Sequence, residues 1–119
     1  MKPEWNGLIT FCGVTDLEKT DQFYHQLLQL PLYKDQGLCR IYDVPGGGKL
    51  GFCSHQPVIK GENSLILTLL TDNVDGVWEH LKKRGLEIAA PVVNDRFNIY
   101  HFFLTDPDGY LVEIQRFLD

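Results

Sequence analysis

The sequence predicts an α+β fold that is built from two tandem βαβββ modules. The same order of strand and helix patterns occurs in both halves of the chain, and corresponding residues stand at corresponding places. Thr15-Asp16 precedes the first predicted helix as Thr71-Asp72 precedes the second, and the hairpin turn at Pro45 matches the turn at Pro107. Because 119 residues accommodate two such modules and little else, we expect a single domain over residues 1–119, with modules at about 7–56 and 63–118.

In the first half, a short apolar strand over 8–14 precedes a helix. Asp16 is a typical N-cap residue, Phe23, Tyr24, Leu27 and Leu28 form an apolar stripe, and Pro31 ends the helix. Three strands are then predicted, at about 32–36, 39–44 and 49–54. Pro45-Gly46-Gly47-Gly48 joins the last two as a hairpin turn.

The second half repeats this order, beginning with a strand over 65–71. Asp72 or Asn73 caps a helix that carries apolar residues at positions i, i+3, i+4 and i+7, namely Val74, Val77, Trp78 and Leu81. Gly85 stands where a left-handed C-cap belongs. The strands that follow are predicted at about 87–93, 99–105 and 111–117, and Asp106-Pro107-Asp108-Gly109 joins the last two.

Charge and composition exclude several classes of partner. The net charge of −5 is unsuited to nucleic acid, which needs clustered Lys and Arg. No apolar stretch approaches the roughly 20 residues that span a bilayer, and the first residues lack the apolar core of a signal peptide. Cys12, Cys39 and Cys53 are an odd number of cysteines, which favours a reducing cytoplasm, so we expect three free thiols.

Two segments resemble the signatures of a known superfamily. Thr105-Asp106-Pro107-Asp108-Gly109-Tyr110-Leu111-Val112-Glu113-Ile114 is similar to the C-terminal signature of the vicinal oxygen chelate superfamily, which comprises glyoxalases, bleomycin resistance proteins and dioxygenases. Val14-Thr15-Asp16-Leu17-Glu18, followed by Phe23-Tyr24, looks like its N-terminal signature. The resemblance implies two modules that place curved mixed sheets around a concave cavity. In the enzymes of this superfamily, a divalent metal is held by side chains from the first and last strand of each module.

By this resemblance the four metal-ligand positions fall on Ile9, Gly51, Ile66 and Glu113. Only Glu113 has a side chain that can bind a divalent metal. The resemblance therefore implies that the usual metal centre is absent, and we expect no cofactor.

Strand alternation predicts which side chains accompany Glu113 on one face of the sheets, if the register inferred from the hairpin turns holds. We expect the ligand-binding residues on this face to be Phe11, Cys53, Thr68, His101, Phe103, Glu113 and Gln115. The same register makes Cys39 a close neighbour of Cys53. Glu113 is the candidate catalytic residue, although it is equally explained as a structural carboxylate paired with His101 or an arginine.

We therefore expect a metal-independent protein that binds a small molecule and forms a homodimer. One alternative is a lyase, isomerase or dioxygenase of the same superfamily, with a divalent metal held unusually by Glu113, His101 and either Cys53 or His55. The other alternative is an interaction module without a ligand. Fold alone does not separate these functions.

Overall fold

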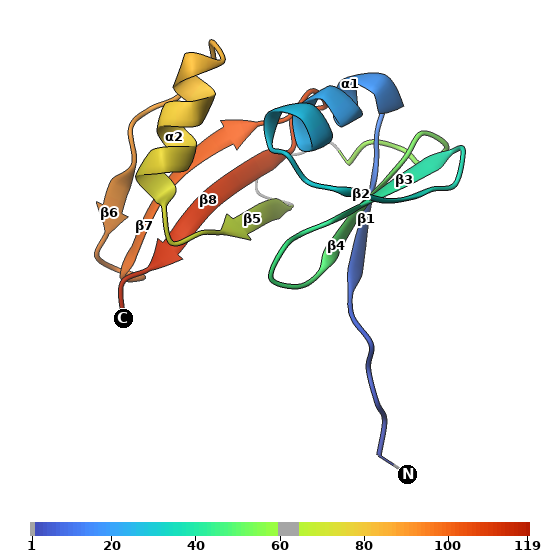
Figure 1. Cartoon of the computed structure of the whole chain (residues 1–119), viewed down its shortest axis with the longest axis horizontal. Helices are drawn as coiled ribbons and strands as arrows, with labels where there is room; N and C mark the ends of the chain where they lie inside the picture. The colour runs from blue at the N-terminus through green and yellow to red at the C-terminus, as the bar shows by residue number, and fades with distance from the viewer. Residues whose placement is uncertain (1, 60–64) are drawn as a thin grey trace. The chain divides into compact units, whose positions relative to one another are not determined.

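The computed structural model describes residues 2–59 and 65–119 (Figure 1). The chain divides into two compact units, Met1–Gly61 and Glu62–Asp119, which we call unit 1 and unit 2. Each unit contains a four-stranded mixed sheet and helical segments. This arrangement confirms the predicted α+β fold with tandem βαβββ modules.

Unit 1 begins with a strand and a short helical segment and continues with three strands. Its elements are β1 (Ile9–Gly13), α1 (Leu17–Asp21), η1 (Gln22–Leu27), β2 (Leu32–Asp35), β3 (Cys39–Asp43) and β4 (Lys49–Cys53). The strand order is β1-β4-β3-β2. The first strand runs parallel to β4, and the hairpin strands are antiparallel.

The helical segment of unit 1 packs on one face of this sheet. Asp16 caps α1 as predicted, because its carboxylate accepts hydrogen bonds from the backbone N–H groups of Glu18 and Lys19. Tyr24 then stacks on Phe52 with ring centroids 4.3 Å apart, and both side chains are fully buried. Alternate strand residues complete this core, namely Cys12, Tyr42 and Leu50.

The predicted first helix differs from the observed one in its second half. After five α-helical residues, the chain forms a π-helical segment, in which Leu28 N–H donates to the carbonyl of Phe23, five residues earlier. A π-helical turn holds more residues than an α-helical one, which brings consecutive side chains closer to one face. We attribute the widening to Phe23 and Tyr24, two neighbours that are both buried here.

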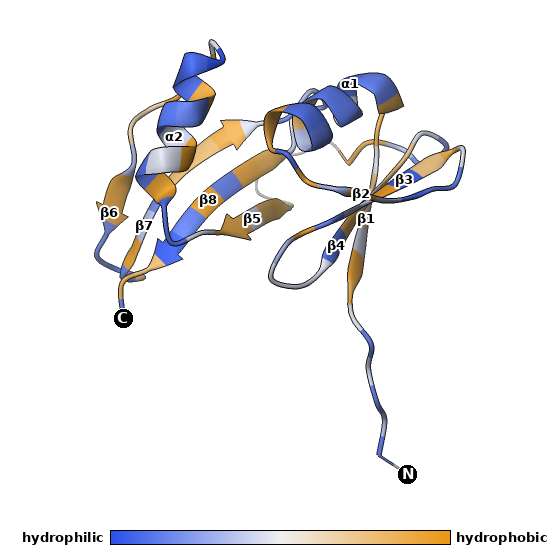
Figure 2. Ribbon diagram, viewed as in Figure 1, coloured by the Kyte–Doolittle hydropathy of each residue, from blue (hydrophilic) through white to orange (hydrophobic). Residues whose placement is uncertain are grey.

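Unit 2 repeats the order of strand, helix and three strands. Its elements are β5 (Ile66–Leu70), α2 (Val74–Lys83), β6 (Val92–Asn94), β7 (Ile99–Thr105) and β8 (Leu111–Phe117). The strand order β5-β8-β7-β6 corresponds to that of unit 1, with β5 parallel to β8. Residues of alternating hydropathy along β8 mark a sheet with two different faces (Figure 2).

The ends of the unit 2 elements follow the predicted chemistry. Asn73 is the N-cap of α2 and accepts a hydrogen bond from Gly76 N–H at 3.0 Å, which settles the choice between Asp72 and Asn73. Gly85 ends the helix region with a positive φ of +90°. In the β7–β8 turn, one Asp106 carboxylate oxygen accepts from the N–H groups of Asp108 and Tyr110.

The predicted strand over 87–93 is wrong for most of its length, because β6 has only the residues Val92–Asn94. The indole N–H of Trp78, on α2, lies within hydrogen-bonding distance of the carbonyls of Ile88 (3.4 Å) and Ala89 (3.1 Å). Pro91 has no N–H to give to a strand pair. The segment is thus held by the helix side chain and joins the sheet only after the proline.

None of the helices in the described parts of the chain is long and apolar enough to cross a membrane.

Candidate functional site

The most polar cluster predicted from the sequence lies on one face of the unit 2 sheet. The other face is apolar and buried, with Phe102, Leu104, Val112 and Ile114, and α2 contacts the same two strands. Glu113 lies between Thr68 on β5 and Phe103 on β7 in the strand register, and His101 pairs with Gln115 one step along. Because residues two apart on a strand share a face, these five side chains project from one face of the sheet. We call it the open face of unit 2 because Thr68 and Phe103 are exposed there, while His101, Glu113 and Gln115 are buried.

Three side chains hold the Glu113 carboxylate. The Thr68 hydroxyl donates to Oε1 at 2.7 Å, and His101 Nδ1 lies 2.6 Å from Oε2. The side-chain amide of Gln115, with its nitrogen turned toward Glu113, donates to both carboxylate oxygens at 3.1 and 3.0 Å. The His101 and Glu113 side chains are only 9% and 10% exposed, so each of these hydrogen bonds replaces water that the carboxylate has lost.

The His101–Glu113 pair engages one nitrogen of the imidazole, Nδ1. Nδ1 faces the carboxylate, which fixes the orientation of the ring, and the edge of the ring lies against Phe103 with centroids 5.0 Å apart. Among the residues that the structure describes, Nε2 has no hydrogen-bonding partner. A histidine oriented in this way by a carboxylate can donate or accept a proton through its other nitrogen.

Apolar side chains surround this polar centre on the open face. Phe103, Ile66 and Leu70 are 40%, 47% and 62% exposed. Phe103 lies two residues from His101 on β7, and the other two each lie two residues from Thr68 on β5. A small number of convergent polar groups within apolar surroundings is typical of a small-molecule site.

The inherited metal positions do not fit a metal ion. Ile9 and Ile66 have no donor atoms, and Gly51 has no side chain. A Cβ at Gly51 would overlap the ring of Phe11, its neighbour in the β1–β4 register. The space from which a ligand would extend at this position is therefore occupied by an aromatic ring, and Glu113 is already bound by three neighbours.

Unit 1 brings together two cysteines and a histidine. Cys39 and Cys53 are directly opposite each other on β3 and β4, as predicted, with Cα atoms 4.1 Å apart. They form a disulfide, which does not include Cys12. The expectation of three free thiols is therefore wrong for this structure, since two cysteines at opposed positions of an antiparallel pair project side by side and their sulfur atoms meet.

His55 completes this group. Its Nδ1 lies 3.9 Å from Cys39 Sγ, and the ligand atoms of Cys39, Cys53 and His55 all lie within 4.8 Å of one another. Within the described residues, these three side chains are the one group of three or more that could hold a metal ion.

The predicted site residues thus fall into two sets. Thr68, His101, Phe103, Glu113 and Gln115 gather on the open face of unit 2, as the register predicted. The other two predicted ligand contacts belong to unit 1: Phe11 is half-exposed beside Gly51, whereas Cys53 is buried in the disulfide.

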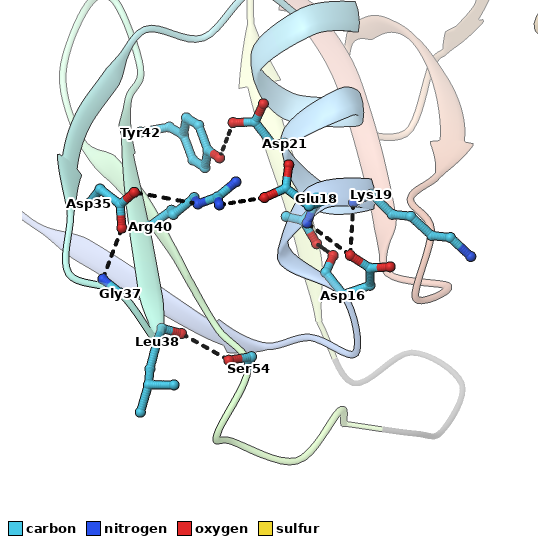
Figure 3. Close-up of polar contacts among 11 residues, drawn as sticks. Asp16, Glu18, Lys19, Asp21, Asp35, Gly37, Leu38, Arg40, Tyr42 and Ser54 are labelled. Carbon is cyan, nitrogen blue, oxygen red and sulfur yellow. Dashed lines mark hydrogen bonds and ion pairs between the residues drawn. The ribbon is translucent and has the colours of Figure 1, made fainter.

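A polar cluster on the helix side of unit 1 was not predicted (Figure 3). Arg40 donates to Glu18 at 2.6 Å, and the Tyr42 hydroxyl donates to Asp21 at 2.6 Å. Burial, and then the hydrogen bond to Asp21, raise the pKa of Tyr42 above its ordinary value of 10.0. The signal was available in the sequence, because Arg40 and Tyr42 are two apart on a strand and Glu18 and Asp21 are three apart on a helix.

Among the residues that the structure describes, two hollows on the surface of unit 2 include residues of the predicted site. One of about 310 Å³ is lined by Leu70, Thr71, Asp72, Gln115, Arg116 and Phe117 and adjoins the open face through Gln115. The other, of about 390 Å³, lies between the 86–89 segment and the strands and includes Phe103. Glu113 lines neither hollow; on β8 it stands between Leu111, which lines one hollow, and Gln115, which lines the other.

Comparison with solved structures identifies the fold. The chain is similar to an integron cassette protein from the mobile metagenome of the Halifax Harbour sewage outfall, with a TM-score of 0.79, 17% identity and coverage of 93% of this chain and 97% of the other. It is also similar to a glyoxalase/bleomycin resistance protein/dioxygenase from Nocardioides (TM-score 0.75, 19% identity, 100% and 87% coverage). Lactoylglutathione lyase from Agrobacterium tumefaciens matches with a TM-score of 0.74, 17% identity and 97% and 96% coverage.

The comparison with curated proteins gave no match. A family profile described as the Glyoxalase/Bleomycin resistance protein/Dioxygenase superfamily matches residues 9–114. The duplicated βαβββ units and this match, which spans nearly the whole chain, show that the chain belongs to the glyoxalase/bleomycin resistance/dioxygenase superfamily.

Proposed function

We propose that the protein binds a small molecule on the open face of unit 2 and that this binding does not require a metal. The observation that carries the proposal is the state of Glu113: its carboxylate is held by Thr68, His101 and Gln115. A carboxylate that is already bound on both oxygens is poorly placed to ligate a metal, and Ile9, Gly51 and Ile66 supply no other donors.

The chemistry of the open face suggests the class of ligand. Ile66, Leu70 and Phe103 offer exposed apolar area, and His101 offers one polar atom near the centre. This combination suits a flat, mainly apolar molecule with one hydrogen-bonding group. In this proposal Phe103 supports the apolar part, His101 contacts the polar group, and Glu113 keeps the imidazole oriented.

The contributions of unit 1 and the location of the protein are also part of the proposal. Phe11 is half-exposed and offers an apolar contact on its own sheet. Cys53 offers a thiol only if its disulfide with Cys39 is opened. We place the protein in the cytoplasm, where reducing conditions would open that bond, and we propose a homodimer, since the edge strands of both sheets favour pairing with further strands.

A second candidate function follows from the His101–Glu113 pair. An imidazole that a carboxylate orients through one nitrogen can act as a general base through the other. A lyase or isomerase that moves a proton with His101 is therefore the enzyme that this geometry favours. The metal-dependent alternative is less well supported: within the described residues, unit 2 offers no third ligating side chain beside His101 and Glu113.

The test is a titration with a neutral naphthylamine dye whose fluorescence rises in apolar surroundings, carried out on non-reduced protein with and without EDTA. We expect saturable binding of one dye per chain that EDTA does not change. His101→Ala and Phe103→Ala should each weaken binding at least about tenfold, since each removes one of the few contacts on this face. Tyr33→Phe, on an exposed strand of unit 1, is the control and should bind as the parent does.

Other results would reject the proposal. Loss of binding in EDTA would favour the metal-dependent enzyme. An absence of saturable binding to any member of a panel of neutral aromatic compounds would favour an interaction module without a ligand.

A further inference from the structure

The Cys39–Cys53–His55 group has the composition of a metal site, and it lies apart from the inherited metal positions. Two thiolates and an imidazole are the ligand types that zinc prefers in proteins. Cys39 and Cys53 come from neighbouring strands that fix their spacing, and His55 follows two residues after Cys53. Both cysteines are buried, and His55 is exposed.

The distances suit a tetrahedral ion once the disulfide is open. Zinc bonds of about 2.3 Å to sulfur and about 2.0 Å to nitrogen place ligand atoms roughly 3.6–3.8 Å apart in a tetrahedron. The observed separation between Cys39 Sγ and His55 Nδ1 is 3.9 Å, and all three ligand atoms lie within 4.8 Å of one another. The sulfur atoms, now bonded, would move apart by small side-chain rotations while the strands keep their register.

The turn that carries His55 is held in place by its backbone. Ser54 N–H donates to the carbonyl of Leu38 at 2.9 Å, and the Ser54 hydroxyl contacts the same carbonyl (Figure 3). Val14 N–H donates to the carbonyl of Cys53 at 3.0 Å. A Cβ on Gly13 would overlap the backbone carbonyl of Pro57, so the end of β1 lies directly against the segment after His55. The three ligands are therefore preorganised by main-chain contacts.

We propose that the Cys39–Cys53–His55 group binds one zinc ion when its disulfide is reduced, with a fourth coordination position open to water. Reduction by a dithiol transfers two electrons and two protons to the disulfide, giving two thiols while the dithiol becomes a disulfide. Zinc then displaces the two thiol protons and bonds to both thiolates and to His55 Nδ1. A peroxide takes two electrons from the thiolates, which re-form the disulfide and release the ion, while the O–O bond of the peroxide breaks and two protons from the solvent convert it to an alcohol and water.

His55 also has a neighbour that fits this role. The side-chain nitrogen of Gln56 lies 3.4 Å from His55 Nε2. When Nδ1 binds a metal, Nε2 carries the proton, and this Nε2–H group donates a hydrogen bond to the Gln56 amide oxygen once the amide turns that oxygen toward the ring. Such a partner on the second nitrogen is usual for metal-bound histidines and fixes the tautomer.

The experiment is a cobalt titration of the full chain, reduced with a water-soluble phosphine under anaerobic conditions. The phosphine takes the oxygen of one water molecule as two thiols form, and it does not compete for the metal as a dithiol would. Reduced protein should develop thiolate-to-cobalt charge-transfer absorption that saturates at one equivalent and disappears when zinc is added. Non-reduced protein should show none.

The variants separate this site from other sources of binding. Replacing even the groups that hydrogen-bond to a metal ligand typically weakens metal binding about 10–100-fold. We therefore expect His55→Ala, which removes a ligand, to weaken cobalt binding more than about tenfold. Cys39→Ser should abolish the charge-transfer band. Cys12→Ala removes a thiol outside the group and should bind as the parent does. Because His55 is exposed, its replacement leaves the fold intact, and circular dichroism checks this.

Three results would overturn the proposal: no charge-transfer band in reduced protein, unchanged affinity in His55→Ala, or loss of the band in Cys12→Ala. Glu113→Gln distinguishes this inference from the proposed function. If Glu113→Gln alone loses the metal, the ion is bound at an inherited position in unit 2, and the metal-independent function fails together with this site. If reduced protein binds no metal while dye binding persists, only this inference fails.

Discussion

At the scale of single residues, Glu113 shows how a ligand position can be kept in sequence and changed in role. The carboxylate sits at the inherited place, but Thr68, His101 and Gln115 now satisfy both of its oxygens. Judged from the sequence alone, burying this carboxylate without a metal would destabilise the fold. In the structure, however, three side chains donate hydrogen bonds to the carboxylate, so it stabilises the fold as their shared acceptor.

This arrangement predicts that two replacements of Glu113 destabilise the protein to different extents. Glu113→Gln keeps the shape and one good acceptor, so its free energy of unfolding should fall by at most about 2 kcal/mol. Glu113→Leu leaves two buried donors, His101 and Gln115, and the exposed Thr68 hydroxyl without their acceptor and should lose about 3–5 kcal/mol. Urea unfolding measures both, with Thr68→Val as the control that removes a single donor. A Leu variant as stable as the parent would show that these hydrogen bonds contribute little.

Tyr42 predicts a loss of stability at alkaline pH. Burial and the hydrogen bond to Asp21 raise its pKa in the folded state, so above pH 10 the unfolded chain gives up this proton while the folded chain retains it. The unfolded state then binds fewer protons, and the free energy of unfolding decreases as pH rises from about 10 toward the folded-state pKa. Unfolding by urea between pH 8 and 11 should show a weaker pH dependence in Tyr42→Phe than in the parent. Tyr33→Phe controls for the removal of an exposed hydroxyl, and equal slopes in parent and Tyr42→Phe would rule out this origin.

At the scale of elements, the contact between β1 and β4 depends on one missing side chain. Phe11 lies over Gly51, and a Cβ at Gly51 would overlap the ring. We expect Gly51→Ala to lose about 1–3 kcal/mol, as overpacked sites do. In a Phe11→Ala background the same replacement should be close to neutral, so a double-mutant cycle followed by urea unfolding should show coupling of more than about 0.5 kcal/mol. Additive effects would mean that the two residues do not share this space.

The β3–β4 hairpin predicts a redox-dependent stability. The Cys39–Cys53 disulfide spans a sequence separation of 14 residues, and closing a loop of this size stabilises a fold by up to about 3 kcal/mol. Non-reduced, unfolded protein should therefore show one reactive thiol, that of Cys12, and phosphine reduction should expose three and lower the midpoint of urea unfolding. Cys39→Ser should be insensitive to the phosphine. Three thiols before reduction would show that the disulfide does not form in the purified protein.

The elements also show which features of the fold the sequence predicts. Hairpin turns at Pro45–Gly48 and Asp106–Gly109 fix the strand register, so the pairing of Phe103 with Glu113 and of Cys39 with Cys53 was predicted correctly. Local patterns do not reveal where a distant side chain binds. The Trp78 contact that shortens β6 and the two buried aromatic residues that widen the first helix are interactions between elements.

The candidate site was likewise predicted in part: the shared face of its residues follows from the sequence, but their hydrogen bonds do not. The sequence places five polar and aromatic residues on one face by strand alternation, and the structure agrees. Whether Glu113 is reactive or already hydrogen-bonded depends on its distances of 2.6–2.7 Å to Thr68 and His101. The hydrophobic pattern of a sequence does not contain such distances. The redox state of Cys39 and Cys53 was mispredicted, because an odd number of cysteines says nothing of how close two of them lie.

At the scale of the whole molecule, the duplicated architecture predicts self-association. Both four-stranded sheets end in edge strands, β1 and β2 in one and β5 and β6 in the other. We expect light scattering of the purified protein to give twice the chain mass of 13.7 kDa across micromolar concentrations. A monomer over this range would reject the homodimer, and the dye titration would then report on a single chain.

The ring of Phe11 over Gly51 also limits the history that is open to this sequence. A glutamate or histidine that arose at position 51 would meet the aromatic ring before its donor atom could reach a metal. Replacement of Phe11 by a smaller residue clears the space but supplies no ligand. Regaining a ligand at this position therefore calls for a change at Phe11 as well as at Gly51, so the histories of these two positions are linked.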